Sequence, residues 1–126
     1  MSRKQRRARR RLPMKGFMNC ESNFTLNDQR HIRFVLLSLS ASGMFLLQKK
    51  AEPLPVQEGD FIDQITLSID PFKSDCFKGI VRRIINLDNT SGKIGMGLEF
   101  TELSPELENK LESYVDLQLK FFGLDA

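Results

Sequence analysis

Apolar and polar residues alternate along several short segments of this chain, a pattern typical of β-strands that bury one face. The alternation is clearest over residues 61–70, where Ile65, Leu67 and Ile69 alternate with polar residues. Residues 30–38 contain Ile32, Phe34, Val35, Leu36 and Leu37, which is too continuous an apolar content for a strand with one exposed face and indicates a central strand. Further strands are predicted at 14–20, 43–48, 77–87 and 93–100. Six short strands separated by turn residues predict a mainly β protein built as an antiparallel barrel.

Residues that favour turns lie between these segments. The stretch 23–29 is rich in them, and Pro53 and Pro55 end the third strand because proline cannot donate a ladder hydrogen bond. Residues 88–92 (Asp-Asn-Thr-Ser-Gly) predict a hairpin that joins the last two strands.

A C-terminal helix is predicted over about residues 104–122. Ser104 can cap its first turn, and Pro105 suits the first helical position. Apolar residues then recur at helical spacing: Leu107, Leu111, Tyr114, Val115, Leu119 and Phe122. Such a stripe packs on the barrel. Leu117 and Phe121 widen the stripe beyond one face, which leaves room for a protein partner or a second copy of the chain.

Charge is distributed unevenly along the 126 residues. The chain carries a net charge of +3, but residues 1–13 hold seven Lys and Arg and no acid, so the remainder is net −4. We therefore divide the chain into a basic flexible arm, residues 1–13, and one barrel domain with its C-terminal helix, residues 14–126. Composition alone also permits a solvated tail that binds polyanions without specificity.

Several classes of protein are disfavoured. The chain shows no signal peptide and no apolar run long enough to span a membrane. Cys20 and Cys76 stand far apart with no second metal ligand nearby, so they are expected to be free thiols in the cytoplasm, and no metal site is expected. His31 is the single histidine and is expected on a strand surface. Phosphate-binding glycine loops and catalytic motifs are absent, so we expect a binding module and no enzyme, with no catalytic residues and no cofactor.

The polar stretch Ser38-Leu39-Ser40-Ala41-Ser42-Gly43 separates two strand-like runs. A turn of this kind presents hydroxyls and backbone N–H groups at a sheet edge, and glycine can adopt a positive φ there. The arm adds arginines four residues apart. Guanidinium groups can pair bidentately with phosphate or with guanine O6 and N7, and can stack on purines.

These motifs, together with Gly97-Leu98-Glu99-Phe100, resemble the PilZ domain family of bacterial receptors for the second messenger cyclic di-GMP. The resemblance extends from about Arg6 to the C-terminal helix. It implies a six-stranded antiparallel PilZ-type barrel, and an arginine arm that closes over the nucleotide at the barrel edge.

The family's paired arginines match Arg7 and Arg11, with Arg6 and Arg10 as helpers, although Arg6 with Arg10 fits the same spacing. The serine and glycine of the family's turn motif match Ser40 and Gly43. Ser38 stands where the family has an acid or an amide. The resemblance therefore implies seven ligand-binding residues: Arg6, Arg7, Arg10, Arg11, Ser38, Ser40 and Gly43.

Two other hypotheses remain open at this point. The chain could be a degenerate PilZ domain that acts as a protein-interaction module through its helix and binds no nucleotide. The least favoured hypothesis is that the basic arm binds RNA or DNA electrostatically. Under the main hypothesis the partners are cyclic di-GMP and a downstream protein.

Overall fold

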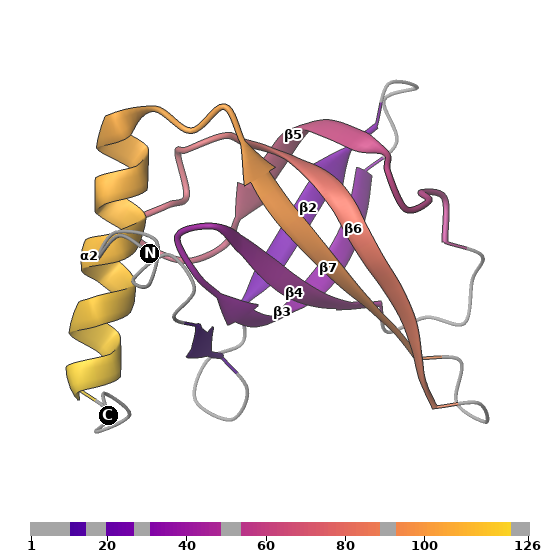
Figure 1. The fold of residues 1–126 in the computed structure, drawn as a ribbon, viewed down its shortest axis with the longest axis horizontal. Helices are drawn as coiled ribbons and strands as arrows, with labels where there is room; N and C mark the ends of the chain where they lie inside the picture. The colour runs from indigo at the N-terminus through magenta and orange to yellow at the C-terminus, as the bar shows by residue number, and fades with distance from the viewer. Residues whose placement is uncertain (1–10, 15–19, 27–30, 49–53, 89–92, 122–126) are drawn as a thin grey trace, which may run out of the picture.

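The computed structural model describes residues 11–14, 20–26, 31–48, 54–88 and 93–121. Seven strands are followed by one long helix within this part of the chain (Figure 1). The elements are β1 (Leu12–Pro13), β2 (Glu21–Thr25), β3 (His31–Leu39), β4 (Gly43–Gln48), β5 (Phe61–Leu67), β6 (Phe77–Asp88), β7 (Lys93–Thr101) and α2 (Pro105–Phe121).

The strands form a closed antiparallel barrel. The order is β3-β2-β5-β6-β7-β4, and β4 pairs with β3 again, so the six longer strands close on themselves and leave no open sheet edge. The short β1 pairs with the end of β3, where Leu12 lies opposite Leu39 and Pro13 opposite Ser38. β4 pairs with the other edge of β3 at Leu39 and Ser38. β1 therefore lies on the same edge of β3 as β2, farther along the strand.

The predicted barrel is confirmed, and five of the six predicted strands correspond to β3, β4, β5, β6 and β7. Most of the first predicted strand, residues 15–19, lies outside the described residues, and its two described ends, Met14 and Cys20, are not in strands. The strand that completes the barrel is β2, which overlaps the stretch 23–29 that was predicted to form a turn. In β2 the inward positions are Ser22 and Phe24, so a polar residue stands where the pattern needs an apolar one.

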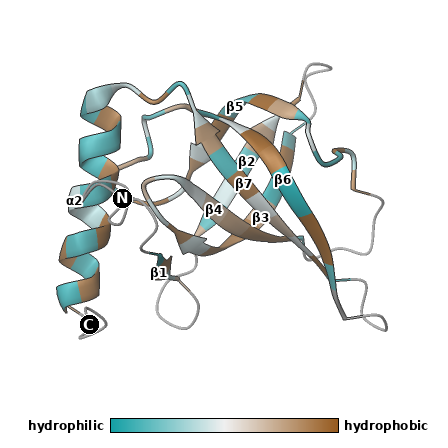
Figure 2. Cartoon of the chain, viewed as in Figure 1, coloured by the Kyte–Doolittle hydropathy of each residue, from teal (hydrophilic) through white to brown (hydrophobic). Residues whose placement is uncertain are grey.

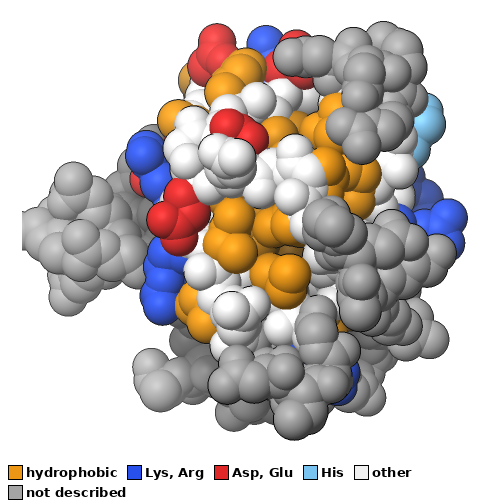
Figure 3. All heavy atoms as spheres, turned by 90° about the vertical axis from the view of Figure 1, so that its right-hand side faces the viewer, with side chains coloured by type: hydrophobic (Ala, Val, Ile, Leu, Met, Phe, Trp, Pro, Cys, Tyr) orange, Lys and Arg blue, Asp and Glu red, His pale blue; other side chains and the backbone are white. Residues whose placement is uncertain are grey.

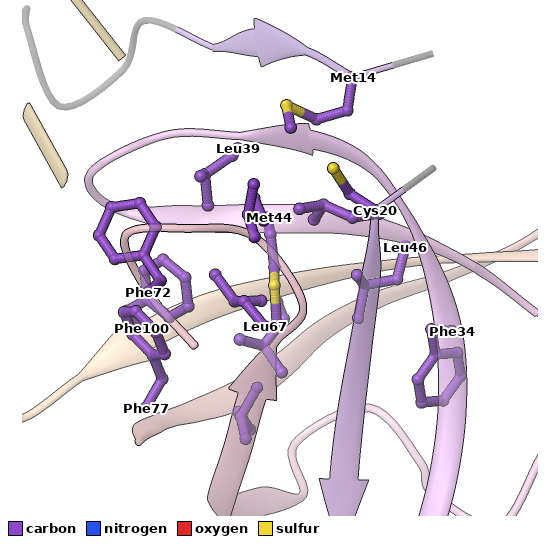
Figure 4. Packing of buried hydrophobic residues seen from close by; sticks show 14 of the residues in the cluster. Met14, Cys20, Phe34, Leu39, Met44, Leu46, Leu67, Phe72, Phe77 and Phe100 are labelled. Carbon is purple, nitrogen blue, oxygen red and sulfur yellow. The ribbon is translucent and has the colours of Figure 1, made fainter. Parts of the chain in front are cut away.

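The inside of the barrel is filled by apolar side chains from every strand. Figure 2 shows the brown apolar positions interrupted by teal polar ones along β6 and β7, as expected for strands with one buried face. Figure 4 shows Phe72, Phe77 and Phe100 grouped at one end of this core. The rings of Phe77 and Phe100 are stacked with centroids 5.0 Å apart, and Phe72 meets Phe77 edge-on at 6.0 Å.

The C-terminal helix begins as predicted. The N–H of Leu107 donates to Ser104 Oγ at 3.1 Å, which is an N-cap bond, and Pro105 is the first helical residue. Leu111, Val115 and Leu119 are buried against the barrel. Leu117 and Phe121 are 64% and 78% exposed, so the helix does have an apolar region that the barrel does not cover. Gly123, expected to end the helix, lies outside the described residues.

The two ends of the barrel differ. In Figure 1, α2 covers the left-hand end and its last residues lie near the C-terminus. The opposite end, seen face-on in Figure 3, shows apolar side chains in the middle and Lys, Arg, Asp and Glu side chains towards the rim. Within the described residues, no helix is both long and apolar enough to cross a membrane.

Candidate functional site

The turn between β3 and β4 is held together by the hydroxyl of Ser40. Its Oγ accepts from the N–H groups of Ser42 and Gly43 at 3.3 and 3.2 Å and lies 3.2 Å from the Gly43 carbonyl, to which it can donate. The Ser40 N–H also donates to that carbonyl, at 2.9 Å. Ser40 is fully buried. Its hydroxyl therefore acts on the turn itself, and the Gly43 N–H that was expected to be free is bonded to it.

Gly43 is needed for close approach of two strands. A Cβ built at this position would lie 2.1 Å from the backbone carbonyl oxygen of Leu98, which is far inside van der Waals contact. Among the described glycines only Gly59 has a positive φ, of 94°. The glycine of the turn motif thus lets β4 pack against β7 and is not required for a left-handed backbone.

The Gly97–Phe100 motif also contributes to the turn. The N–H of Phe100 donates to the carbonyl of Ser42 at 2.8 Å, while the Phe100 ring is anchored in the core. In the β4–β7 register, Gly43 lies opposite Glu99 and Phe45 opposite Gly97. The two sequence motifs are therefore two sides of one local structure, which explains why they occur together.

The base of the arm lies beside this turn. Because Leu12 pairs with Leu39 and Pro13 with Ser38, the exposed Arg11 is at the end of β3 where the turn begins. Leu12 is fully buried, so residues 12 and 13 belong to the barrel and the arm ends at Arg11. Arg6, Arg7 and Arg10 lie outside the described residues.

One row of outward-facing residues crosses the barrel wall at this point. It runs Pro13, Ser38, Phe45, Gly97, Arg83 from β1 through β3, β4 and β7 to β6. Pro13 and Arg83 are exposed, and the three residues between them are half-buried. We call this set the outer row. A Cβ at Gly97 would lie 3.7 Å from the Cβ of Arg83 and 3.9 Å from Cδ2 of Phe45, which is ordinary van der Waals contact, so a methyl group would fit at this position.

Charged groups border the outer row on β6 and β7. The register of β6 and β7 shifts between Val81 and Arg83, and this bulge turns both Arg82 and Arg83 to the outside. Arg82 donates to Glu99 Oε1 from Nε at 2.8 Å and from Nη2 at 2.6 Å. Sequence reasoning missed these three residues. The available signal was the Arg82-Arg83 pair inside an alternating strand, since one of the two would point inward unless the strand bulged.

Groups with shifted pKa values lie in the core, where β1 and the helix meet the barrel. Burial raises the pKa of the Cys20 thiol, and burial together with the nearby Cys20 raises the pKa of Tyr114. Both cysteines are free, as predicted, with Cys20 buried and Cys76 exposed. His31 is on the strand surface as expected, with Nδ1 3.0 Å from Thr25 Oγ1. No cluster of potential metal ligands occurs among the residues that the structure describes.

These features define a class of small β-barrel domains. The barrel has six strands and is closed, a C-terminal helix follows it, the turn after β3 contains a buried serine, and a basic segment joins the barrel beside that turn. Within that class the chain belongs to the PilZ domain family, whose model matches residues 4–117.

Solved structures share this fold. The PilZ domain of YcgR from Escherichia coli with c-di-GMP superposes with a TM-score of 0.72 at 23% identity, covering 90% of this chain and 91% of that one. The complex of K. pneumonia MrkH with c-di-GMP gives a TM-score of 0.74 at 14% identity, covering 92% of this chain and 54% of that one. The Borreliella burgdorferi PlzA protein in complex with c-di-GMP gives 0.61 at 16% identity, covering 93% and 55%.

This chain covers nearly all of the isolated YcgR domain but only about half of the longer proteins. In the c-di-GMP complex of YcgR, for example, it covers 45% of the YcgR chain. No curated protein matches the sequence.

Proposed function

We propose that this chain is a cyclic di-GMP receptor in which the arginine arm closes over the nucleotide on the outer row. The observation that carries the proposal is the pairing of β1 with the end of β3, which puts Arg11 next to the Ser38–Gly43 turn. The family membership and the c-di-GMP in the similar solved structures support the choice of ligand.

The chemistry of the surface suits a ligand with two phosphates and two guanines. Arginines from the arm can neutralise the phosphates and stack on the purines. Ser38 and Gly97 are small residues on either side of Phe45 in the outer row, so in this proposal a base packs against them and Phe45 offers an aromatic contact. The small side chains of the row would let the nucleotide approach the backbone.

The turn residues have different roles in this proposal. Gly43 and Ser40 act by fixing the backbone of the turn, because their polar groups are bonded to one another. Ser38 faces outward between Pro13 and Phe45 and is the turn residue placed to touch a ligand directly.

Calorimetric titration with cyclic di-GMP, with GTP as a control ligand, tests the proposal. The double variant Arg7→Ala/Arg11→Ala should weaken binding by at least about a hundredfold, since charge-assisted hydrogen bonds contribute about 1.5–3 kcal/mol each. Its thermal melting should be nearly unchanged. The double variant Arg3→Ala/Lys4→Ala removes the same charge from the same arm and should lose much less affinity.

A third double variant, Arg6→Ala/Arg10→Ala, decides which pair of arginines binds the ligand. A larger loss for Arg6→Ala/Arg10→Ala than for Arg7→Ala/Arg11→Ala would assign the ligand to the alternative pair. Equal losses in all three double variants would indicate nonspecific attraction of a polyanion, with a steep salt dependence. No heat with cyclic di-GMP would contradict the receptor assignment.

A protein-interaction module is the second candidate, favoured by the exposed Leu117 and Phe121 on α2. The two functions are compatible, since a receptor needs a downstream partner. The free thiols of Cys20 and Cys76 favour a reducing compartment and hence the cytoplasm.

A further inference from the structure

Glu99 is an exposed residue of β7 next to the outer row. It is opposite Gly43 on β4 and two residues from Gly97 on its own strand, so both neighbours on this side lack side chains. Leu98 and Phe100 are buried, whereas the Glu99 side chain is 50% exposed. Its carboxylate therefore lies on the same face of the barrel wall as the outer row, beside two glycines.

Within the described residues, the hydrogen bonds to this carboxylate reach only one of its oxygens. Both come from Arg82 and go to Oε1, at 2.8 and 2.6 Å. A carboxylate oxygen has two lone pairs, so Oε2 can accept further hydrogen bonds. The Arg82 contact fixes the orientation of the group and offsets its charge, which reduces repulsion between the carboxylate and a ligand phosphate.

A carboxylate acceptor selects one purine over the other. Guanine presents two donors side by side, N1–H and the exocyclic amino group, whereas adenine presents an unprotonated N1 at the same place. The five residues of the outer row carry no carboxylate, and Ser38 supplies only a hydroxyl where the PilZ pattern has an acid or amide. Glu99, next to the row on β7, supplies a carboxylate.

We propose that Glu99, oriented by Arg82, reads the guanine edge of the nucleotide and sets the preference for guanine over adenine. This inference rests on the proposed function, because it assumes a cyclic dinucleotide on the outer row. It assigns to β7 a specificity residue that the arginine and serine motifs do not include.

The test compares cyclic di-GMP with cyclic di-AMP by calorimetry on the full chain. Glu99→Gln keeps the size of the side chain but replaces one acceptor oxygen by a donor group. It should weaken cyclic di-GMP binding by about ten- to a hundredfold, the range expected when a hydrogen bond to a charged group is lost. Binding of cyclic di-AMP should change little, so the preference for guanine should shrink by a similar factor.

Two variants separate recognition from the ion pair and from net charge. Arg82→Gln breaks the pair but keeps the carboxylate, and should lose less of the guanine preference than Glu99→Gln does. Glu106→Gln on α2 makes the same charge change at an exposed position away from the outer row, and should leave both affinities unchanged. The ion pair is half exposed, so none of the three variants should lower the melting temperature much.

The outcomes are distinct. Failure of the unmodified chain to bind cyclic di-GMP overturns the proposed function and this inference together. Binding that is unchanged or tighter in Glu99→Gln overturns the inference alone, since the carboxylate would then be neutral or repulsive. An equal loss of guanine preference in Arg82→Gln and Glu99→Gln also overturns it, because the intact pair and not the acceptor would then be required.

Discussion

Two neighbouring rows of residues cross the same strands of the barrel wall and differ in almost every property. The inner row runs Leu12, Leu39, Met44, Leu98, Val81, and each of these side chains is at most 3% exposed. The outer row, one residue away on every strand but β6, contains proline, serine, phenylalanine, glycine and arginine. The inner row therefore fills the core, while the outer row has small side chains at Ser38 and Gly97 on the surface of the barrel.

The difference shows how a small barrel can combine stability with binding. Apolar burial on the inner row contributes to folding whatever the outer face carries. The outer face can then have small residues in its middle and charged ones at its border, as Gly97 and Arg83 do. We expect substitutions on the inner row to lower stability, and substitutions on the outer row to affect nucleotide binding more than stability.

The largest effect is expected for Met44→Ala on the inner row. Met44 is fully buried, and truncation of a buried methionine costs about 2–5 kcal/mol through lost burial and the cavity that remains. Phe45→Ala, on the next residue but in the outer row, should cost distinctly less stability and should weaken nucleotide binding more. Urea unfolding of both variants measures the contrast, and equal losses of stability would contradict the division into two rows.

Glycine substitutions should give a smaller contrast of the same kind. Gly43→Ala forces a Cβ towards the Leu98 carbonyl oxygen, and overpacking of this sort costs about 1–3 kcal/mol. Gly97→Ala has room for its methyl group and should change stability by less than about 0.5 kcal/mol. If the two melting temperatures fall by the same amount, the close approach of β4 and β7 is not what requires glycine at position 43.

The smallest effect on stability is expected in the turn. Ser40→Ala removes the hydroxyl that bonds the Ser42 and Gly43 N–H groups, at a cost of about 1 kcal/mol. Ser38→Ala on the outer row should be close to neutral in thermal melting. A Ser40→Ala variant as stable as the unmodified chain, yet weaker in binding, would show that Ser40 contacts the ligand directly.

The sequence was sufficient for most of the barrel because apolar residues alternate with polar residues or glycine in β5 and β7, and an apolar run bounded by turn residues marks β4. It failed for β2, where the inward Ser22 breaks the alternation. The helix was predictable from Ser104 and Pro105 because capping is a local interaction.

Candidate site residues were predictable only where they fall in a motif. The motif placed Ser40 and Gly43 in a turn, but it did not indicate that their polar groups bond to each other. Glu99 and Arg82 are 17 positions apart, and their contact depends on the register of β6 and β7 and on the bulge between Val81 and Arg83. The adjacent Arg82 and Arg83 indicate a bulge, but the register of β6 and β7 arises from packing between strands, so no local pattern in the sequence specifies that Glu99 meets Arg82.

The short strand β1 sets a limit on the reach of the arm. Leu12 is anchored beside Leu39, and an extended chain spans at most about 3.3–3.6 Å per residue, so the Cα of Arg7 lies within about 18 Å of that anchor. In the proposed receptor, an arginine of the arm reaches a ligand at the turn of the same chain. The contact thus closes an intramolecular loop of only a few residues. The entropy lost on closure depends on the length of this tether, so each residue inserted between Arg11 and Leu12 would lower the effective concentration of arginine at the ligand.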